Sequence, residues 1–355
     1  MRMAGVHPGL AEHGLQVDRV ARELVFSNKA RLFPGEDEIQ ILDVELGPPR
    51  NPRWGSYHRG LTIRYRRDGR PAALNLWLKF RPGLDALLPV LEDYDRRLDR
   101  PVFPRPYFAW RSPDGEPAFL ATGRIEGVLL RDRLLRLAPL RQSARLLPVF
   151  RSNGAKMRAF HDAFAAEQLA PVGDVVRRLA DLVSCTPHLA AAERDAVAVH
   201  LEREAGRLGI DALPAIRTHD DWVLRNIIVT PDGTDYVIDA GGLQGAAKWR
   251  WYDISLFLLN LDFQLKWAPL TTHSMMTRLW HAFWEGYVGE RGLPDGVAPV
   301  EVPPLLYLVR LHWLLDGVVR QPYLDLVTGT GALNERLGRR LKTGIASGRC
   351  ALLDF

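Results

Sequence analysis

The chain has 355 residues, with 47 Lys and Arg against 42 Asp and Glu, and carries a formal net charge of +5 at pH 7. Its 47% hydrophobic and 25% charged residues are typical of a globular protein and exclude a disordered or fibrous chain, and the length allows two lobes with a core each. No basic run or base-stacking module accompanies the mild positive charge, so we expect no nucleic-acid partner.

The sequence also indicates a compartment. No stretch has the uninterrupted apolar length of a membrane span, and the opening segment lacks the apolar core of a signal peptide. Cys185 and Cys350 are the only cysteines, and two distant cysteines in a chain of this length are typical of a reducing environment. We therefore expect a cytoplasmic protein without an integral membrane segment.

Residues 1–35 are predicted to be a lead-in with one short helix, from Val17 to Phe26. Its apolar residues recur at helical spacing, at Val17, Val20, Ala21 and Leu24. Such a helix either packs as an arm on the first lobe or reaches over its ligand, and the packing arm is the favoured interpretation.

Three strands are expected next, at Glu38–Leu46, Leu61–Tyr65 and Ala72–Phe80, because their apolar residues alternate or cluster between turn signals. The connection over residues 47–60 is long and contains three prolines, so we predict a loop there. The third strand carries Lys79 near its end.

A helix is predicted within residues 83–98, with its regular part starting near Leu88 because Pro89 suits a first turn. Two more strands follow, Val102–Trp110 and Ala118–Thr122, joined by a turn at Ser112–Gly115. These elements complete a β-rich first lobe.

Helices dominate the rest of the chain. We predict three domains: a lead-in at 1–35, a β-rich lobe at 36–126 and a helical lobe at 127–355. The fold class is α+β. The expected helices are Ser152–Phe164, Val172–Val183, Ala190–Gly209, Asp253–Phe263, Leu270–Gly289, Pro303–Val319 and Leu333–Ser347.

The most informative stretch is residues 218–242, THDDWVLRNIIVTPDGTDYVIDAGG. His219, Asp221 and Asn226 precede a strand-like run, which leads through the turn Pro231–Gly233 into a second run that ends at Asp239. A turn signal between two β-branched runs predicts a hairpin. The hairpin would bring three oxygen-bearing side chains to the ends of two short strands.

Phosphoryl transfer needs this kind of residue set, because the protein has to position two reactants and neutralise charge rather than form covalent bonds. Asp221 can accept the hydrogen of an attacking hydroxyl group. Asn226 and Asp239 offer hard oxygen ligands of the kind that suits Mg²⁺ bound to a nucleotide's phosphates.

The order H-x-D-x-x-x-x-N, hairpin, D-x-G is that of a kinase catalytic loop. In these residues the chain resembles the aminoglycoside phosphotransferase/choline kinase family, which has a bilobal protein-kinase-like fold: an N-terminal antiparallel sheet lobe with one helix and a larger, mainly helical C-terminal lobe. Two positions depart from the family pattern. Asp220 replaces a glycine, so the backbone there need not be glycine-like, and Ala240 replaces an aromatic residue.

The resemblance implies roles for residues of the first lobe. Lys79 would contact the α- and β-phosphates of the nucleotide, and a carboxylate on the following helix would hold this lysine in place. Glu92 is the first choice for that carboxylate, with Asp93 and Asp95 as alternatives.

Two further segments would contact the nucleotide by the same resemblance. Backbone N–H groups near Gly55, Ser56 and Gly60 would cradle phosphate oxygens, although a role in substrate contact or at the surface is equally open. The crossing between lobes, which contains Arg124 and Glu126, would hydrogen-bond an adenine edge.

Three residues of the second lobe are expected to support the site. Asp253 would accept hydrogen bonds from the backbone of the catalytic loop, and His219 would hold that loop. His161 resembles a helix-end histidine of the family and is expected to be structural.

The implied function is an ATP- and Mg²⁺-dependent phosphotransferase, with GTP possible as donor, acting on a hydroxyl group of a small polar metabolite or antibiotic such as an aminoglycoside, a sugar or choline. A glycan or lipopolysaccharide-core kinase and a non-catalytic nucleotide-binding protein are the alternatives. Four acidic residues would either bind a polycation or lie in solvent: Asp262, Glu285, Glu290 and Asp316. Trp280 and Trp284, four residues apart on one helix face, are expected in the core.

Overall fold

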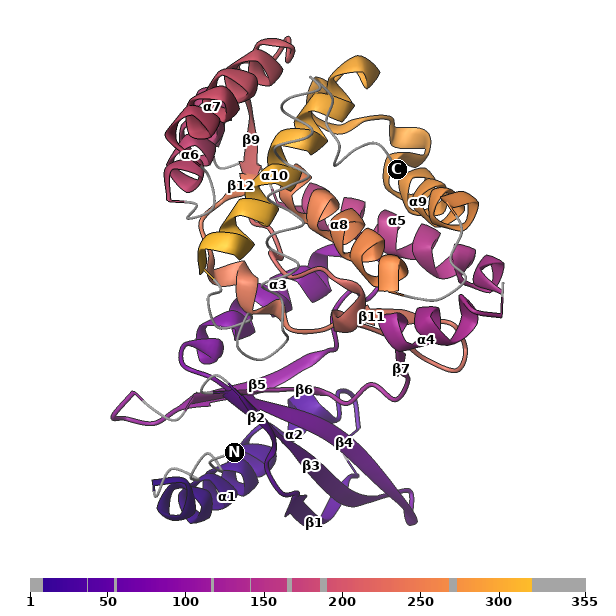
Figure 1. Ribbon diagram of the computed structural model, residues 1–355. Helices are drawn as coiled ribbons and strands as arrows, with labels where there is room; N and C mark the ends of the chain where they lie inside the picture. Colours follow the sequence, from indigo (N-terminus) through magenta and orange to yellow (C-terminus); the bar gives the residue numbers. More distant parts are fainter. Residues whose placement is uncertain are drawn as a thin grey trace. The chain divides into compact units, whose positions relative to one another are not determined.

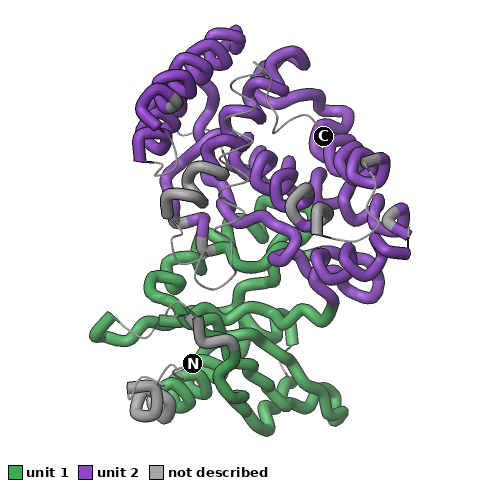
Figure 2. Tube along the Cα trace, in the orientation of Figure 1, with its two compact units in different colours: residues 1–127, 236–241 green, residues 128–235, 242–355 purple. Residues whose placement is uncertain are grey.

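A computed structural model describes residues 9–36, 38–53, 56–115, 118–140, 142–164, 168–185, 190–267 and 273–320. The chain forms two compact units (Figure 2). Unit 1 comprises residues 1–127 and 236–241, and unit 2 comprises residues 128–235 and 242–355. The predicted division assigned 236–241 to the second lobe, whereas this short segment packs with the first.

Unit 1 is built on an antiparallel sheet with the strand order β1-β3-β4-β6-β5, in which β2 also pairs with β3 (Figure 1). The strands agree with the predicted order along the chain. Their bounds are β1 Gln40–Leu46, β2 Arg50–Arg53, β3 Ser56–Arg67, β4 Arg70–Phe80, β5 Pro106–Arg111 and β6 Ala118–Gly123.

The two faces of this sheet differ because side chains alternate along each strand. On β4, Leu76 and Leu78 are fully buried in a core cluster, whereas Trp77 and Lys79 point to the opposite face and are partly exposed. Helix α1 (Gly9–Ser27) contributes Val17, Ala21 and Val25 to the same core cluster. The lead-in helix is therefore a packing arm, as favoured from the sequence.

The predicted loop at 47–60 is wrong in part. Residues 50–53 form β2, and β3 extends back to Ser56, so much of this segment is a hairpin. Proline marks a loop in most contexts, but Pro52 is tolerated here because β2 pairs with β3 alone and lies at an edge of the sheet. Trp54 and Gly55 are outside the described residues.

Three short helical elements complete unit 1: α2 (Lys29–Leu32), a 3₁₀ turn η1 (Leu84–Leu87) and α3 (Leu88–Arg97). The start of α3 at Leu88, with Pro89 in its first turn, confirms the prediction. Leu91 and Tyr94 are the buried residues of α3.

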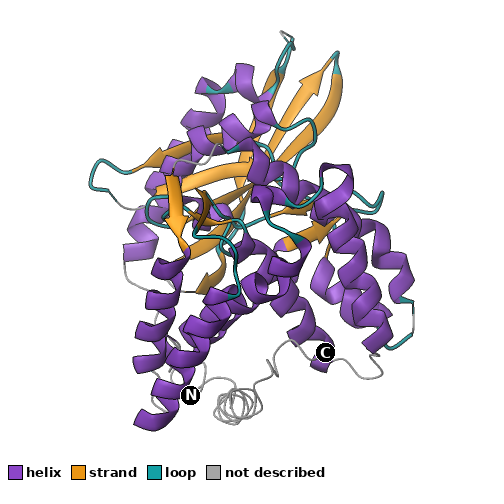
Figure 3. Cartoon of the chain, turned by 90° about the horizontal axis from the view of Figure 1, so that it is seen from above, coloured by secondary structure: helices purple, strands orange, loops and turns teal. Residues whose placement is uncertain are grey.

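Unit 2 is mainly helical (Figure 3), and its predicted helices are confirmed wherever the structure describes them. The expected helix Leu333–Ser347 lies outside the described residues. None of the helices described has the length and apolar character that crossing a membrane requires. The long helices are α5 Leu147–Ala163, α6 Val172–Ser184, α7 Ala191–Gly206, α8 Trp251–Trp267, α9 His273–Val288 and α10 Val302–Arg320.

Short elements connect these helices and carry the predicted motif. One small sheet has the order β11-β10-β7, and a second has the order β12-β9-β8. Their bounds, with those of the neighbouring helical turns, are β7 Val128–Leu129, α4 Leu130–Leu137, η2 Ser143–Leu146, β8 Gln168–Pro171, β9 Ala212–Ile216, η3 Leu224–Asn226, β10 Ile227–Val229, β11 Asp235–Val237, η4 Ala240–Gln244, β12 Lys248–Trp249, η5 Gly289–Arg291, η6 Pro294–Gly296 and η7 Pro299–Glu301.

Helices α5 and α9 approach each other very closely. A Cβ atom added to Gly154 would lie 2.0 Å from the carbonyl oxygen of Phe283, and one added to Gly286 would lie 1.9 Å from that of Arg151. Because glycine lacks this atom, the two helices can pack backbone against backbone. This contact fixes α5, whose C-terminal half carries His161.

Candidate active site

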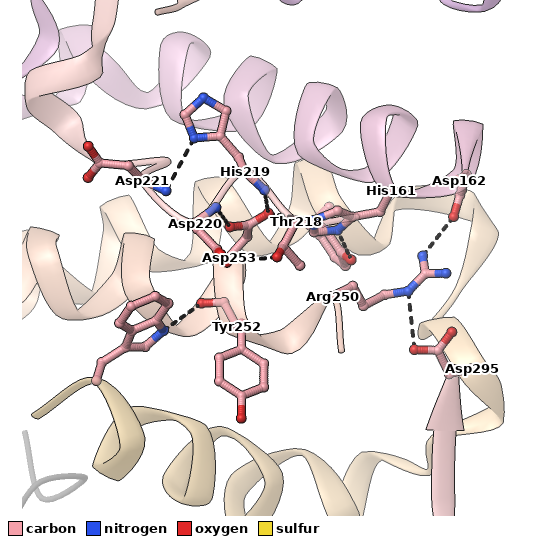
Figure 4. A network of polar contacts seen from close by, with 12 residues as sticks. His161, Asp162, Thr218, His219, Asp220, Asp221, Arg250, Tyr252, Asp253 and Asp295 are labelled. Carbon is pink, nitrogen blue, oxygen red and sulfur yellow. Dashed lines mark hydrogen bonds and ion pairs between the residues drawn. The ribbon is translucent and has the colours of Figure 1, made fainter. Parts of the chain in front are cut away.

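The predicted catalytic loop connects β9 to η3. Asp253, at the start of α8, hydrogen-bonds the backbone of this loop (Figure 4). The backbone N–H of His219 donates to one carboxylate oxygen of Asp253 at 2.8 Å, and that of Asp220 donates to the other, also at 2.8 Å. This geometry confirms the expectation that Asp253 holds the backbone of the loop.

Asp253 is fully buried together with His161, whose Nε2 lies 3.2 Å from a carboxylate oxygen of Asp253. Burial alone would raise the pKa of Asp253, but the hydrogen bond from His161 and the loop N–H groups lower it. Burial lowers the pKa of His161, so the ring is neutral. An ionised carboxylate can only accept; Nε2 therefore carries the proton, and Nδ1 accepts from the hydroxyl of Tyr287 at 2.9 Å.

Asp220 adopts the backbone conformation that glycine favours, with a φ of 59°. The expectation that this backbone need not be glycine-like was wrong, since the loop keeps its left-handed residue and only the side chain differs. The carboxylate of Asp220 accepts hydrogen bonds from Thr218 and Lys248. Burial raises its pKa, and the charge of Lys248 opposes that rise.

Gly242 is required by the same loop, because an added Cβ atom would lie 1.9 Å from the carbonyl oxygen of His219. A second anchor holds Trp222, the residue after Asp221. The indole N–H of Trp222 donates to Asn153 at 3.3 Å, and Asn153 in turn donates to Asp235 at 2.9 Å. The loop is thus fixed from α5, from the hairpin and from α8.

Asp221 and Asn226 lie together, as predicted. The side-chain amide of Asn226 donates to a carboxylate oxygen of Asp221 at 2.8 Å and to its backbone carbonyl at 2.9 Å. The other carboxylate oxygen of Asp221 accepts from Arg225 at 3.1 Å. Asp221 remains 36% exposed, so its carboxylate is accessible to a substrate. His219 is buried, and its Nδ1 accepts from the N–H of Asp221 at 3.3 Å.

In unit 1, the ammonium group of Lys79 forms an ion pair with Asp239. The expected pair between Lys79 and Glu92 does not form: Glu92 pairs instead with Arg31 of α2. Asp93, an alternative for the same role, pairs with Arg96 and Arg97 of its own helix. The correction has a simple cause, because the lead-in segment supplies a guanidinium that a reading of α3 alone does not reveal.

The remaining predicted nucleotide contacts are spread along the sheet of unit 1. The guanidinium of Arg124 lies over the Trp77 ring, 5.5 Å from its centroid, and its backbone N–H donates to Asn75 at 3.0 Å. Glu126 is exposed in the segment that leaves the sheet. Ser56 is the first residue of β3, and its side chain is outside the described residues.

The residues present suit Mg²⁺ held partly by nucleotide phosphates. Asp239 offers a carboxylate, and Asn226 directs its amide nitrogen to Asp221, which leaves its amide oxygen as a ligand. Among the described residues, no three His, Cys, Asp or Glu side chains gather into a metal cage. Mg²⁺ that takes several of its ligands from phosphates and water requires no such cage.

Two of the four acidic residues considered for binding a polycation have side chains that the structure describes. Glu285 is ion-paired with Arg151 at 2.6 Å, and Glu290 is exposed. The side chains of Asp262 and Asp316 are outside the described residues. Trp284 packs against Trp251 and Tyr287, but Trp280 and Trp284 are both only partly buried, so the expected core position is not confirmed.

The fold and the loop geometry define a protein-kinase-like chain, and solved structures of that class match it. An apo thermostable mutant of aminoglycoside phosphotransferase APH(4)-Ia shares 16% identity with a TM-score of 0.50, covering 87% of this chain and 96% of that one. The ternary complex of a further variant of that enzyme with AMP-PNP and hygromycin B shares 16% sequence identity with a TM-score of 0.51. The match covers 87% of this chain and 95% of that one. The ternary complex of another variant with ADP and hygromycin B also shares 16% sequence identity with a TM-score of 0.51. This match covers 93% of this chain and 98% of that one.

These similarities establish the fold: the chain has the protein-kinase-like fold of the aminoglycoside phosphotransferases. No protein-family model and no curated protein sequence matches the chain.

The sequence analysis did not single out three residues that contact or pair with predicted site residues. Arg225 contacts Asp221, Lys248 contacts Asp220, and His58 pairs across the sheet with Lys79. Arg225 lies inside the motif and was readable as a charge four residues after Asp221. The other two contacts depend on strand register and on a distant turn, which no local pattern reveals.

Proposed function

We propose that this protein transfers the γ-phosphoryl group of ATP, with Mg²⁺, to a hydroxyl group of a small molecule. The observation that carries the proposal is the paired arrangement of Asp221 and Asn226 on a loop whose backbone is fixed by a buried, ionised Asp253. A loop held this firmly keeps a base and a metal ligand in fixed geometry, which is what phosphoryl transfer requires of the protein.

Each residue has a distinct role in this proposal. Asp221 orients the acceptor hydroxyl and takes its proton. Lys79 binds the phosphates, and its ion pair with Asp239 keeps it oriented before the nucleotide arrives. Asn226 and Asp239 would hold Mg²⁺, whose contribution is to neutralise charge on the phosphate oxygens. Because the N–H of Arg124 already bonds within the sheet, the adenine edge falls to the backbone that follows, including Glu126.

Replacing Asp221 by asparagine tests the proposal, because the amide keeps the size of the side chain but cannot take a proton. We expect ADP release with a good acceptor to fall by about 10²- to 10⁴-fold. Stabilisation of the protein by Mg²⁺ and AMP-PNP, measured by thermal shift, should be retained.

The matched control is Asp174→Asn, since Asp174 is an exposed aspartate of α6 that pairs with Arg177. This variant should change neither the rate of ADP release nor the stabilisation by Mg²⁺ and AMP-PNP. Unaltered turnover in Asp221→Asn would remove Asp221 from the reaction. Nucleotide binding without transfer to any acceptor class in the wild type would indicate a non-catalytic nucleotide-binding protein.

A further inference from the structure

Each of the two carboxylates on the catalytic loop is covered by a basic side chain. Lys248 forms an ion pair with Asp220, and Arg225 forms one with Asp221 at 3.1 Å. Lys248 is 20% exposed, whereas Arg225 is 57% exposed. The Asp220 pair is thus mostly enclosed, and the guanidinium of Arg225 is the accessible charge beside the reacting carboxylate.

The surroundings of Arg225 add to this positive charge. Helix α4 packs against η3, the turn that contains Arg225, and carries Arg133 and Arg136 in addition to Arg131, which pairs with Asp132 of the same helix. One acidic residue considered for a polycation, Glu285, is already neutralised by Arg151. The exposed guanidinium of Arg225 beside Asp221 therefore offers a binding group to an anion, whereas Glu285 is already paired.

We propose that the phosphoryl acceptor carries an anionic group, a carboxylate or a phosphate, close to its reacting hydroxyl, and that Arg225 binds this group. This inference rests on the proposed function and specifies its substrate class. A guanidinium can bind either anion through two parallel hydrogen bonds, so it both selects the acceptor and fixes its orientation.

Binding of the anion also prepares Asp221 for the reaction. When Arg225 turns to the acceptor, the Asp221 oxygen that it held becomes available to the hydroxyl. That oxygen takes the hydroxyl proton as the new oxygen–phosphorus bond forms and the bond from the γ-phosphorus to the β,γ-bridging oxygen breaks, leaving ADP. Arg225 takes part in no bond change and acts as a specificity-determining residue.

The test compares small hydroxyl compounds that differ in charge, using the full-length protein with Mg²⁺ and ATP. Glycerol 3-phosphate and glycerate are the anionic probes, glycerol is neutral, and choline and kanamycin are cationic. We expect kcat/KM for at least one anionic probe to exceed that for glycerol by about tenfold or more, since hydrogen bonds to charged groups are strong. Comparison of the two anionic probes distinguishes phosphate from carboxylate.

Arg225→Ala should raise KM for the preferred anionic probe by about 10- to 100-fold, with a much smaller effect on KM for ATP. Arg177→Ala is the matched control, because Arg177 is an exposed, ion-paired arginine of α6, and it should leave both constants unchanged. Calorimetric titration of glycerol 3-phosphate and glycerate into the AMP-PNP complex measures anion binding independently of turnover. The wild type should bind at least one of them, and Arg225→Ala should lose that binding.

Four results would overturn the inference. They are a preference for cationic or neutral acceptors, no binding of either anionic probe by the wild type, unchanged anion binding in Arg225→Ala, and an effect of Arg225→Ala mainly on KM for ATP. The last would assign the guanidinium to the nucleotide. Failure of the proposed function is distinguishable, because it would appear as no stabilisation of the wild type by Mg²⁺ and AMP-PNP, or as no ADP release with any of the five acceptors.

Discussion

Asp253 has no contact with a reactant in the proposed mechanism, yet it determines the shape of the loop that does. Its two oxygens accept two consecutive backbone N–H groups, and His161 supplies a third hydrogen bond. A buried charge is costly unless it is fully hydrogen-bonded, so this carboxylate and its partners have to be kept as a set.

The burial of neutral His161 predicts how stability depends on pH. The unfolded chain binds a proton at this histidine near pH 6.5, whereas the folded chain does not, because burial lowers the pKa of His161. Its contribution to stability is therefore complete above about pH 6.5 and is lost as the pH falls below that value. We expect the thermal midpoint of the wild type to decrease between about pH 7.5 and pH 5.5.

His161→Gln provides the comparison, since its amide can still donate to Asp253 but does not titrate. The decrease between the two pH values should be smaller in this variant. Part of it should remain, because burial also lowers the pKa of His58 and His200. Equal decreases in both proteins would show that His161 does not contribute.

At the residue scale, the sequence predicted which side chains belong to the loop but not all of their partners. Asp221 and Asn226 follow from motif spacing, Asp253 was expected from the family resemblance, and the hydrogen bonds of all three agree with these expectations. The pairing of Glu92 with Arg31 and the left-handed backbone of Asp220 do not follow, because each depends on what the folded chain brings nearby. Charge and turn patterns describe neighbours in sequence, whereas these features depend on neighbours in space.

The crossing of α5 and α9 makes a prediction at the scale of elements. Gly154→Ala or Gly286→Ala would place a Cβ atom about 2 Å from a backbone oxygen of the facing helix, so the helices would have to separate. We expect each change to lower the free energy of unfolding by about 1–3 kcal/mol or more, measured by urea denaturation.

Gly173→Ala is the control, because it lies in the first turn of α6 with nothing within 4 Å of an added Cβ atom. Its unfolding midpoint should be unchanged or slightly raised, since alanine restricts the unfolded chain more than glycine does. Similar midpoints for all three variants would mean that α5 and α9 tolerate a wider separation.

Elements were predicted well where one local signal dominated. The helices have apolar residues at helical spacing, and α3 starts where its proline allows. The β2–β3 hairpin was missed because Pro48, Pro49 and Pro52 all indicate a loop, and only the edge position of β2 makes Pro52 acceptable. Whether a strand lies at an edge is a property of the assembled sheet, so a single sequence does not contain it.

At the scale of the whole molecule, nucleotide binding should appear as stabilisation, because a ligand that binds only the folded chain shifts the folding equilibrium. Mg²⁺ with AMP-PNP at 100 times its dissociation constant should stabilise the protein by about 2.7 kcal/mol. Lys79→Met and Asp239→Asn should each remove most of this effect, because in the proposed function these two ion-paired residues of unit 1 bind the phosphates and the metal.

Arg111→Met is the control for these variants, because Arg111 is a cation of the same unit that pairs with Asp85 rather than with Asp239. It should keep the full nucleotide-dependent stabilisation. A shift of normal size in Lys79→Met would place the nucleotide elsewhere.

The short segment 236–241 also has a consequence for engineering. Since it packs with residues 1–127 although it lies more than a hundred positions further along, the chain passes between the units at 127/128, 235/236 and 241/242. A hybrid protein made by joining the front half of this gene to the back half of another would therefore combine Lys79 with a foreign aspartate. To transplant the intact ion pair, a designer must move two separate pieces of DNA.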